Sequence, residues 1–139
     1  MDNEFVINGG NPMITFRRAL LDQKLTESIF LMRGRVLDIG GTKSNKRGSF
    51  IPPVEKVKFW KYLNPDPAAD ADYICSADII PLDNESIETV IMTEVLEYLE
   101  YPQKVLSEIY RILSPKGICL ISFPLLHAVH GDWQKDRQR

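Results

Sequence analysis

The sequence has few cysteines, little net charge and no long apolar run, and each shortage excludes a class of protein. Its two cysteines, Cys75 and Cys119, are too few for a disulfide framework and lack the spacing of a metal site. Both lie in apolar runs, which predicts buried free thiols in a reducing cytosol. A net charge of −2 gives no electrostatic footprint for nucleic acid. The longest apolar stretch, 118–126, contains Pro124 and is far shorter than the roughly 20 residues of a membrane-spanning helix.

The remaining composition is that of a globular protein with one domain. At 139 residues, with 44% hydrophobic and 26% charged residues, the chain can bury a core. We expect one domain over 1–139, with 1–11 as a loose N-terminal arm and 132–139 as a tail. The acidic start lacks the positive charge of a secretory signal, so we expect a cytoplasmic protein without membrane or nucleic-acid partners. The basic spots at 43–47 and 135–139 are interpreted as solvated faces.

Apolar runs separated by turn residues predict an α/β fold with an open, mainly parallel sheet and helices on both faces. Strands are expected at 35–39, 57–63, 72–76, 89–92 and 118–123. One helix is expected from Pro12 to about Met32. A second opens at Pro102 and closes at residues 114–117, where Gly117 is free to take a positive φ. The connection 41–57 leaves little room for a crossover helix.

Ligands of such sheets bind beyond the carboxyl ends of the strands, so the residues that follow each strand form the candidate site. In chain order these are Asp38, Gly40, Gly41, Asn64, Asp66, Asp78, Ile79, Thr93, Glu94, His127 and His130. Glycines let a ligand approach the backbone closely, and Asn64 and Asp66 can accept hydrogen bonds from ribose hydroxyls. Each of these residues also has a structural explanation that competes with ligand binding. The glycines could form a tight turn, Asp78 could cap a helix or turn, and Glu94 and Glu97 could lie on a helix surface.

Two other glycine motifs do not fit. A dinucleotide fingerprint would need glycines at the positions of Thr42 and Asn45. A phosphate-binding loop would need glycines in place of Leu37 and Thr42, although Lys43 and Ser44 reproduce its ending. A nicotinamide-dependent oxidoreductase is therefore the weakest alternative.

Four segments together resemble the class I S-adenosylmethionine-dependent methyltransferases. They are RVLDIGG, NPD, SADIIPL and the long block TVIMTEVLEYLEYPQKVLSEIYRILSPKGICLISFP. The resemblance covers about residues 35–131 and is closest to the branch that acts on small molecules and surface sugars. It implies a Rossmann-like sheet of about five strands that lacks the family's usual last two, and S-adenosylmethionine as cofactor. It also implies methyl transfer to a small-molecule acceptor, with a sugar of a surface polysaccharide pathway favoured.

The resemblance also implies roles for the candidate residues. Asp38, Gly40 and Gly41 would border the methionine portion of the cofactor, Asn64 the ribose, Asp78 and the Ile79 backbone the adenine, and Thr93 and Glu94 the methyl group. The segment PLLHAVHGD would face the acceptor. One of its histidines, His127 or His130, could be a general base, since a pKa near ~6.5 suits proton removal around neutral pH. The pair could instead share a metal or have no role.

The sequence departs from the family pattern at several positions. Thr42 and Ser44 stand where later glycines are usual, and Asn64 replaces a carboxylate. The amide would weaken ribose binding by on the order of 1–2 kcal/mol, which Asp66 could offset. Glu88 and Tyr98 replace a usual aspartate and histidine. These departures favour an alternative from another class, a non-catalytic methyltransferase-like binding module.

Overall fold

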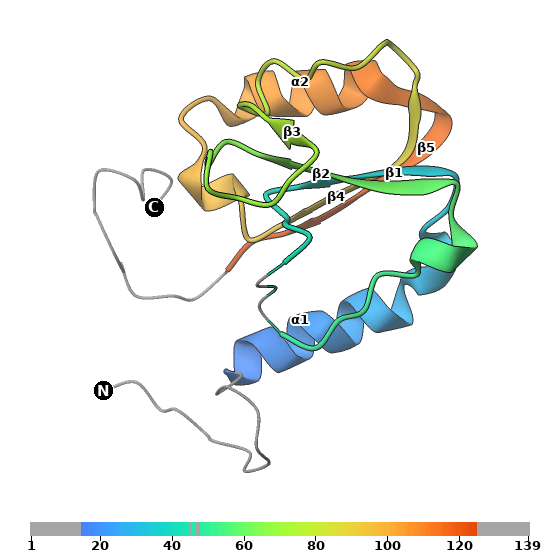
Figure 1. Ribbon diagram of the computed structural model, residues 1–139, viewed down its shortest axis with the longest axis vertical. Coiled ribbons are helices and arrows are strands. Elements are labelled where there is room, and N and C mark those ends of the chain that lie inside the picture. Colours follow the sequence, from blue (N-terminus) through green and yellow to red (C-terminus); the bar gives the residue numbers. More distant parts are fainter. Residues whose placement is uncertain (1–14, 45, 47, 125–139) are drawn as a thin grey trace.

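The computed structural model describes residues 15–44, 46 and 48–124 (Figure 1). Its helices are α1 (Phe16–Glu27) and α2 (Pro102–Ile112), with short 3-10 turns η1 (Ile29–Leu31), η2 (Val54–Lys56) and η3 (Leu96–Tyr98). Its strands are β1 (Arg35–Ile39), β2 (Phe59–Asn64), β3 (Tyr73–Ile74), β4 (Ile87–Thr93) and β5 (Leu113–Ser122). This alternation confirms the predicted α/β class.

The five strands form one parallel sheet in the order β3-β2-β1-β4-β5. The chain runs outward from β1 through β2 to β3, then crosses back to build β4 and β5 on the other side. The order therefore reverses between β1 and β4, which is where ligands of open α/β sheets bind. Ile39 pairs with Leu63 on one side and with Met92 on the other. The carboxyl ends of the three central strands consequently lie at one edge.

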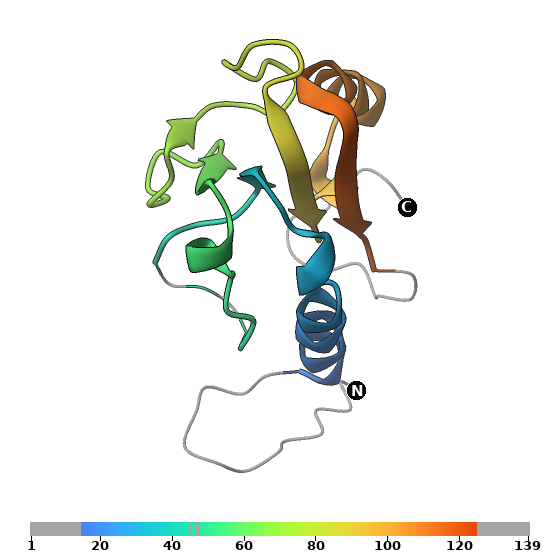
Figure 2. The same ribbon diagram turned by 90° about the vertical axis from the view of Figure 1, so that its right-hand side faces the viewer.

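Helices cover both faces of the sheet, α2 on one side and α1 on the other (Figures 1 and 2). Alternation along β1 supplies both cores, because Val36 belongs to the α1 side and Leu37 to the α2 side. On the α2 side, Ile109 packs with Leu37 in one buried cluster. On the α1 side, Leu25 packs with Val36 in a second cluster. Central strands buried on both faces explain the nearly continuous apolar runs of the sequence.

The first helix begins later and ends earlier than predicted. Thr15 has extended backbone angles, φ −65° and ψ 152°, and its hydroxyl accepts a hydrogen bond from the Arg18 amide at 3.3 Å. This N-cap sets the helix start at Phe16. Pro12 lies outside the described residues. The helix ends at Glu27, and η1 carries the chain on towards β1.

The predicted connection after the second helix is also wrong in detail. β5 begins at Leu113, directly after α2, and the positive φ of 64° belongs to Lys116 and not to Gly117. Gly117 is required for a different reason. A Cβ atom there would lie 2.8 Å from the Ser114 carbonyl oxygen and 3.3 Å from that of Glu88. Glycine thus permits close approach of two backbones.

Candidate functional site

The glycine turn after β1 is closely packed. Gly40 has a φ of +83°, and its amide donates to the Leu63 carbonyl at 2.7 Å. A Cβ on Gly40 would collide with the Val95 side chain, and one on Gly41 would lie 2.6 Å from the Asp38 carboxyl carbon. Neither glycine can therefore be replaced without moving its neighbours.

Asn64 braces this turn. Its side-chain amide nitrogen donates to the carbonyls of Gly40 and Gly41, at 3.2 Å each, and its Oδ1 accepts from the Asp66 amide at 3.0 Å. The prediction placed Asn64 as an acceptor for ribose hydroxyls. In the structure both of its polar atoms already have protein partners. Asp66 is exposed, and its Oδ1 accepts from the Ala68 amide at 2.9 Å, which leaves Oδ2 as the freer acceptor.

Asp38 is a partly buried carboxyl near the end of β1. Loss of hydration raises its pKa to about 7, against the opposing influence of the Trp60 indole and of the positive charges of Lys46 and Arg18. The Trp60 indole nitrogen is itself buried without a well-formed hydrogen bond. Near neutral pH this carboxyl is therefore balanced between its protonated and ionised forms.

Lys46 follows the glycine turn and lies against Tyr62 of β2. Its ammonium donates to the Tyr62 hydroxyl at 2.6 Å and lies 4.9 Å from the centre of the ring. Burial lowers the pKa of Lys46, and the Asp38 carboxyl opposes this change. Burial also raises the pKa of Tyr62 to about 12, so the phenol stays neutral at physiological pH. Lys46 is exposed, in agreement with its interpretation as part of a solvated face, and its ammonium is nevertheless engaged by Tyr62.

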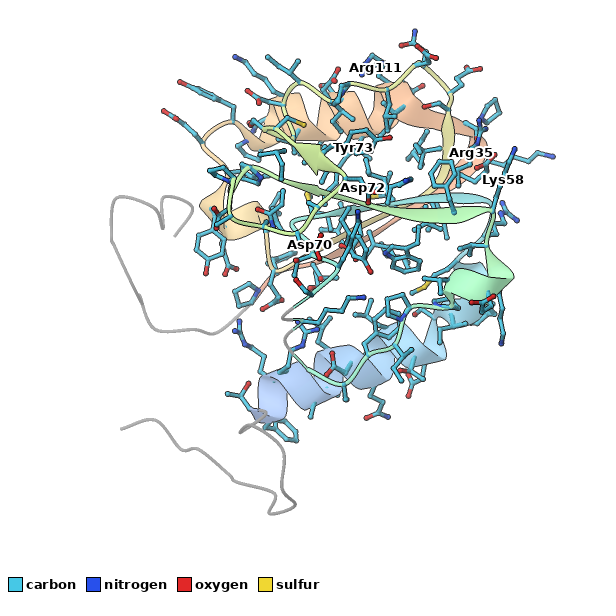
Figure 3. The ribbon with its side chains drawn as sticks, viewed as in Figure 1. Arg35, Lys58, Asp70, Asp72, Tyr73 and Arg111 are labelled. Atoms are coloured by element: carbon cyan, nitrogen blue, oxygen red, sulfur yellow. The ribbon has the colours of Figure 1, made fainter. Side chains whose placement is uncertain are left out.

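Asp72, labelled in Figure 3, connects the same loop with β2. Its Oδ1 lies 2.9 Å from the Lys43 ammonium and 3.1 Å from that of Lys61, and its Oδ2 accepts from the Tyr62 amide at 2.9 Å. The carbonyl of Asp70 accepts a further hydrogen bond from the Lys43 amide at 2.8 Å. These contacts fix the start of the connection between β1 and β2. In the described part of this connection, η2 is the only helical structure.

Two residues of α2 hold the segment that contains Asp78 and Ile79. Glu108 accepts from the Ile80 amide at 2.8 Å, and Arg111 donates to the Ile80 carbonyl at 2.9 Å and to the Leu82 carbonyl at 2.7 Å. The spacing of three residues places Glu108 and Arg111 on one helix face. Ile79 is left 75% exposed at the carboxyl side of β3, and its amide donates to the Ser76 carbonyl at 3.3 Å.

Glu94 connects α1 with β5. It has a φ of 57°, and its carboxylate lies 2.6 Å from the Arg17 guanidinium and accepts from the Ser122 hydroxyl at 3.0 Å. The nearby Glu97 is buried, with 8% of its surface exposed, and lies in η3 and not on the surface of an α-helix. Thr93 ends β4 beside these groups and is partly buried.

The carboxyl edge thus brings together Asp38, Gly40, Gly41 and Asn64, with Thr93 and Glu94 following the adjacent strand and Asp78 and Ile79 the outer one. Sequence reasoning missed Lys46, Tyr62 and Asp72. Tyr62 occupies an inward position on β2, but no motif marks these three residues. His127 and His130 lie outside the described residues.

Two further findings concern only the described part of the chain. Its Cys75 and Cys119 are free and partly, not fully, buried, and no group of three metal-ligating side chains occurs there. Burial raises the pKa of Cys119 to about 11. In the same residues, no helix has the length and apolar character needed to cross a membrane.

Comparisons with known proteins agree with this arrangement. Residues 55–121 match a family model described as a methyltransferase domain. No curated protein matches the chain. The fold is similar to that of an S-adenosylmethionine-dependent methyltransferase from Thermotoga maritima, with a TM-score of 0.57 and 23% identity over 76% of this chain and 51% of the other. An S-adenosylmethionine-dependent methyltransferase from Aquifex aeolicus gives a TM-score of 0.50 and 19% identity over 68% of this chain and 58% of the other.

The same fold also occurs in the cyclase SpnF, with a TM-score of 0.58 and 17% identity over 84% of this chain and 48% of that one. The present chain spans about half the length of the structures it matches. The matched segment begins in η2 and ends within β5, so it includes every strand except β1. Residues 55–121 match the methyltransferase-domain model, and the chain shares its fold with S-adenosylmethionine-dependent methyltransferases.

Proposed function

We propose that this chain binds S-adenosylmethionine at the carboxyl edge of its sheet and takes part in methyl transfer to a small-molecule acceptor. The observation that supports this most directly is the Gly40–Gly41 turn. It lies at the reversal of strand order, has no room for a Cβ atom, and is flanked by the Asp38 carboxyl. The family match of residues 55–121 supports the same cofactor.

The residues at this edge suit the cofactor in most respects. Asp38 offers a carboxyl to the positively charged methionine end. Ile79 offers an exposed apolar side chain to a base, with Asp78 beside it as an acceptor for an amino group. Asn64 suits the ribose less well, because its amide is engaged with the glycine carbonyls. Asp66 is the better-placed acceptor for ribose hydroxyls on this chain.

S-adenosylmethionine supplies a methyl group on a positively charged sulfur, which an oxygen, nitrogen or carbon of the acceptor can displace. The protein's contribution is then alignment of the two partners in a site from which water is excluded. We assign the acceptor to the small molecules, with a sugar of a surface polysaccharide pathway as the favoured class. His127 or His130 is the candidate general base where the acceptor must lose a proton.

Thermal unfolding with and without S-adenosylhomocysteine tests the cofactor site, with nicotinamide dinucleotides as controls. A specific ligand at about 100 times its dissociation constant adds roughly 2.7 kcal/mol to the free energy of unfolding. For a domain of this size, we expect the melting temperature to rise by several degrees. The absence of a shift at millimolar S-adenosylhomocysteine would overturn the proposal.

A second candidate function, a non-catalytic binding module, is favoured by the engagement of Asn64. An enzyme of this family would be expected to leave the ribose-binding side chain free, whereas here it stabilises the turn. The two candidates differ in one measurement. A methyltransferase releases S-adenosylhomocysteine in the presence of an acceptor, whereas a binding module shows the melting shift and no turnover with any sugar, amine or phenol tested.

A further inference from the structure

We propose that Lys46 is a positioning residue that binds the carboxylate of the amino-acid end of S-adenosylmethionine, while Asp38 faces its ammonium. The inference rests on the proposed function and goes further. It assigns recognition of the amino-acid end of the cofactor to two residues beside the glycine turn, Asp38 and Lys46. No motif in the sequence marks Lys46 for this role.

Lys46 differs from the other cationic side chains near the turn because its hydrogen-bond partner is a neutral hydroxyl and not a carboxylate. Lys43 and Lys61 lie within 3.1 Å of the Asp72 carboxylate, and Arg18 lies 2.9 Å from that of Asp22. Among the described residues, no carboxylate lies within 4.0 Å of the Lys46 ammonium, which instead donates to the neutral hydroxyl of Tyr62. A neutral phenol is a weaker partner than an anion, so a ligand carboxylate can replace it.

Asp38 and Lys46 are close enough to influence each other's charge, and Tyr62 links them. Tyr62 Cδ1 and the Asp38 carboxyl carbon both lie within 2.8 Å of the Cβ position that Gly41 leaves vacant. The Tyr62 hydroxyl accepts from Lys46. A carboxyl group and an ammonium group therefore flank the turn, and among the described residues neither forms an ion pair within 4.0 Å. An amino acid carries the complementary pair, an ammonium and a carboxylate, at neutral pH.

The test compares two ligands that differ only in the carboxylate. These are S-adenosylhomocysteine and S-adenosyl-3-thiopropylamine, which keeps the nucleoside, sulfur and ammonium. Dissociation constants are measured calorimetrically for the full chain and for Lys46→Met, Lys46→Arg and Lys104→Met. The last is a matched control, because the ammonium of Lys104, a residue of α2, also lies against a tyrosine ring, 4.6 Å from the centre of Tyr101.

We expect the unaltered chain to bind S-adenosylhomocysteine roughly tenfold more tightly than the amine, because one charge-assisted hydrogen bond is lost with the carboxylate. Lys46→Met should weaken the binding of S-adenosylhomocysteine by that factor and leave the binding of the amine unchanged. The two ligands should then bind this variant equally well. Lys46→Arg should retain the preference for S-adenosylhomocysteine, and Lys104→Met should behave as the unaltered chain.

If the Lys46→Met protein still binds S-adenosylhomocysteine more tightly than the amine, the inference about Lys46 is overturned. The proposed function would stand in that case, because the protein would still bind the cofactor product. Tighter binding of S-adenosylhomocysteine by Lys46→Met would also overturn the inference, because the lysine would then obstruct the site. If neither ligand binds the unaltered chain, the proposed function fails and the inference fails with it. Melting temperatures measured without ligand confirm that each variant is folded.

Discussion

At the scale of single residues, Asp38 makes the stability of the protein depend on pH. Its pKa is about 7 in the folded chain, against 3.8 as the ordinary value. Between these two values the folded state binds more protons than the unfolded state. The free energy of unfolding therefore falls as pH rises from about 4 to about 7, by at most a few kcal/mol from this group.

Asp38→Asn removes this dependence, because an amide does not ionise. We expect the variant to gain stability relative to the unaltered chain between pH 5 and pH 8, measured by urea unfolding at both values. Comparing the two proteins at each pH cancels the groups they share, His127 and His130 included. Glu88 and Glu108, whose pKa values are lowered to about 2 by Arg35 and Arg111, lose their contribution only below this window. An equal difference at both pH values would contradict the assignment.

The residue scale is also where sequence reasoning succeeded least. The assignment of Asp38, Gly40 and Gly41 to a cofactor site stays a prediction, which rests on a carboxylate and two glycines at the end of one short apolar run. The contact of Lys46 with Tyr62 joins residues 16 positions apart, and that of Asn64 with Gly41 joins residues 23 apart. Such pairs depend on how segments meet in space, which no pattern within a single segment specifies.

At the scale of elements, α2 acts as a clamp on the loop from Ile80 to Asn84. Arg111 donates to the Leu82 carbonyl at 2.7 Å and to the Asn84 side chain at 2.9 Å, in addition to its bonds with Ile80 and Glu108 (Figure 3). A single guanidinium therefore satisfies several acceptors that the irregular backbone leaves unpaired.

Arg111→Met should lower the free energy of unfolding by about 1–3 kcal/mol, since the carbonyls lose their donor while the aliphatic packing remains. Urea unfolding measures this loss. Ser107→Ala, an exposed change on the same helix, should alter stability by less than about 0.5 kcal/mol. An Arg111→Met protein as stable as the Ser107→Ala protein would show that the clamp contributes nothing.

Element types were more predictable than element boundaries. The strands at 35–39 and 89–92 and the helix opened by Pro102 follow from local apolar periodicity and from proline at a first helical position. Boundaries failed where a cap or a strand partner decides them. Thr15 sets the start of α1 by a hydrogen bond, and β5 begins at Leu113 because that residue pairs with Ile87.

At the scale of the whole molecule, burial predicts which parts open last. β1 has a strand on each side and a helix on each face, and Val36 and Leu37 are fully buried. β3 has two residues at one edge of the sheet. Local opening requires least energy where contacts are few. We therefore expect native-state hydrogen exchange to be slowest for the amides of β1 and β4 and fastest, among strands, for β3. Equal exchange in β1 and β3 would contradict this order.

The parallel sheet has a consequence for how the chain is made. Parallel neighbours cannot be joined by a tight hairpin, so each pairing waits for a later part of the sequence. Val36 meets Trp60 early, but its partner on the other side, Thr89, is synthesised much later. A nascent chain that has not reached Ile87 exposes one hydrogen-bonding edge of the future central strand. At that stage the nascent chain presents an unpaired strand edge, the kind of surface that favours aggregation or capture by a chaperone.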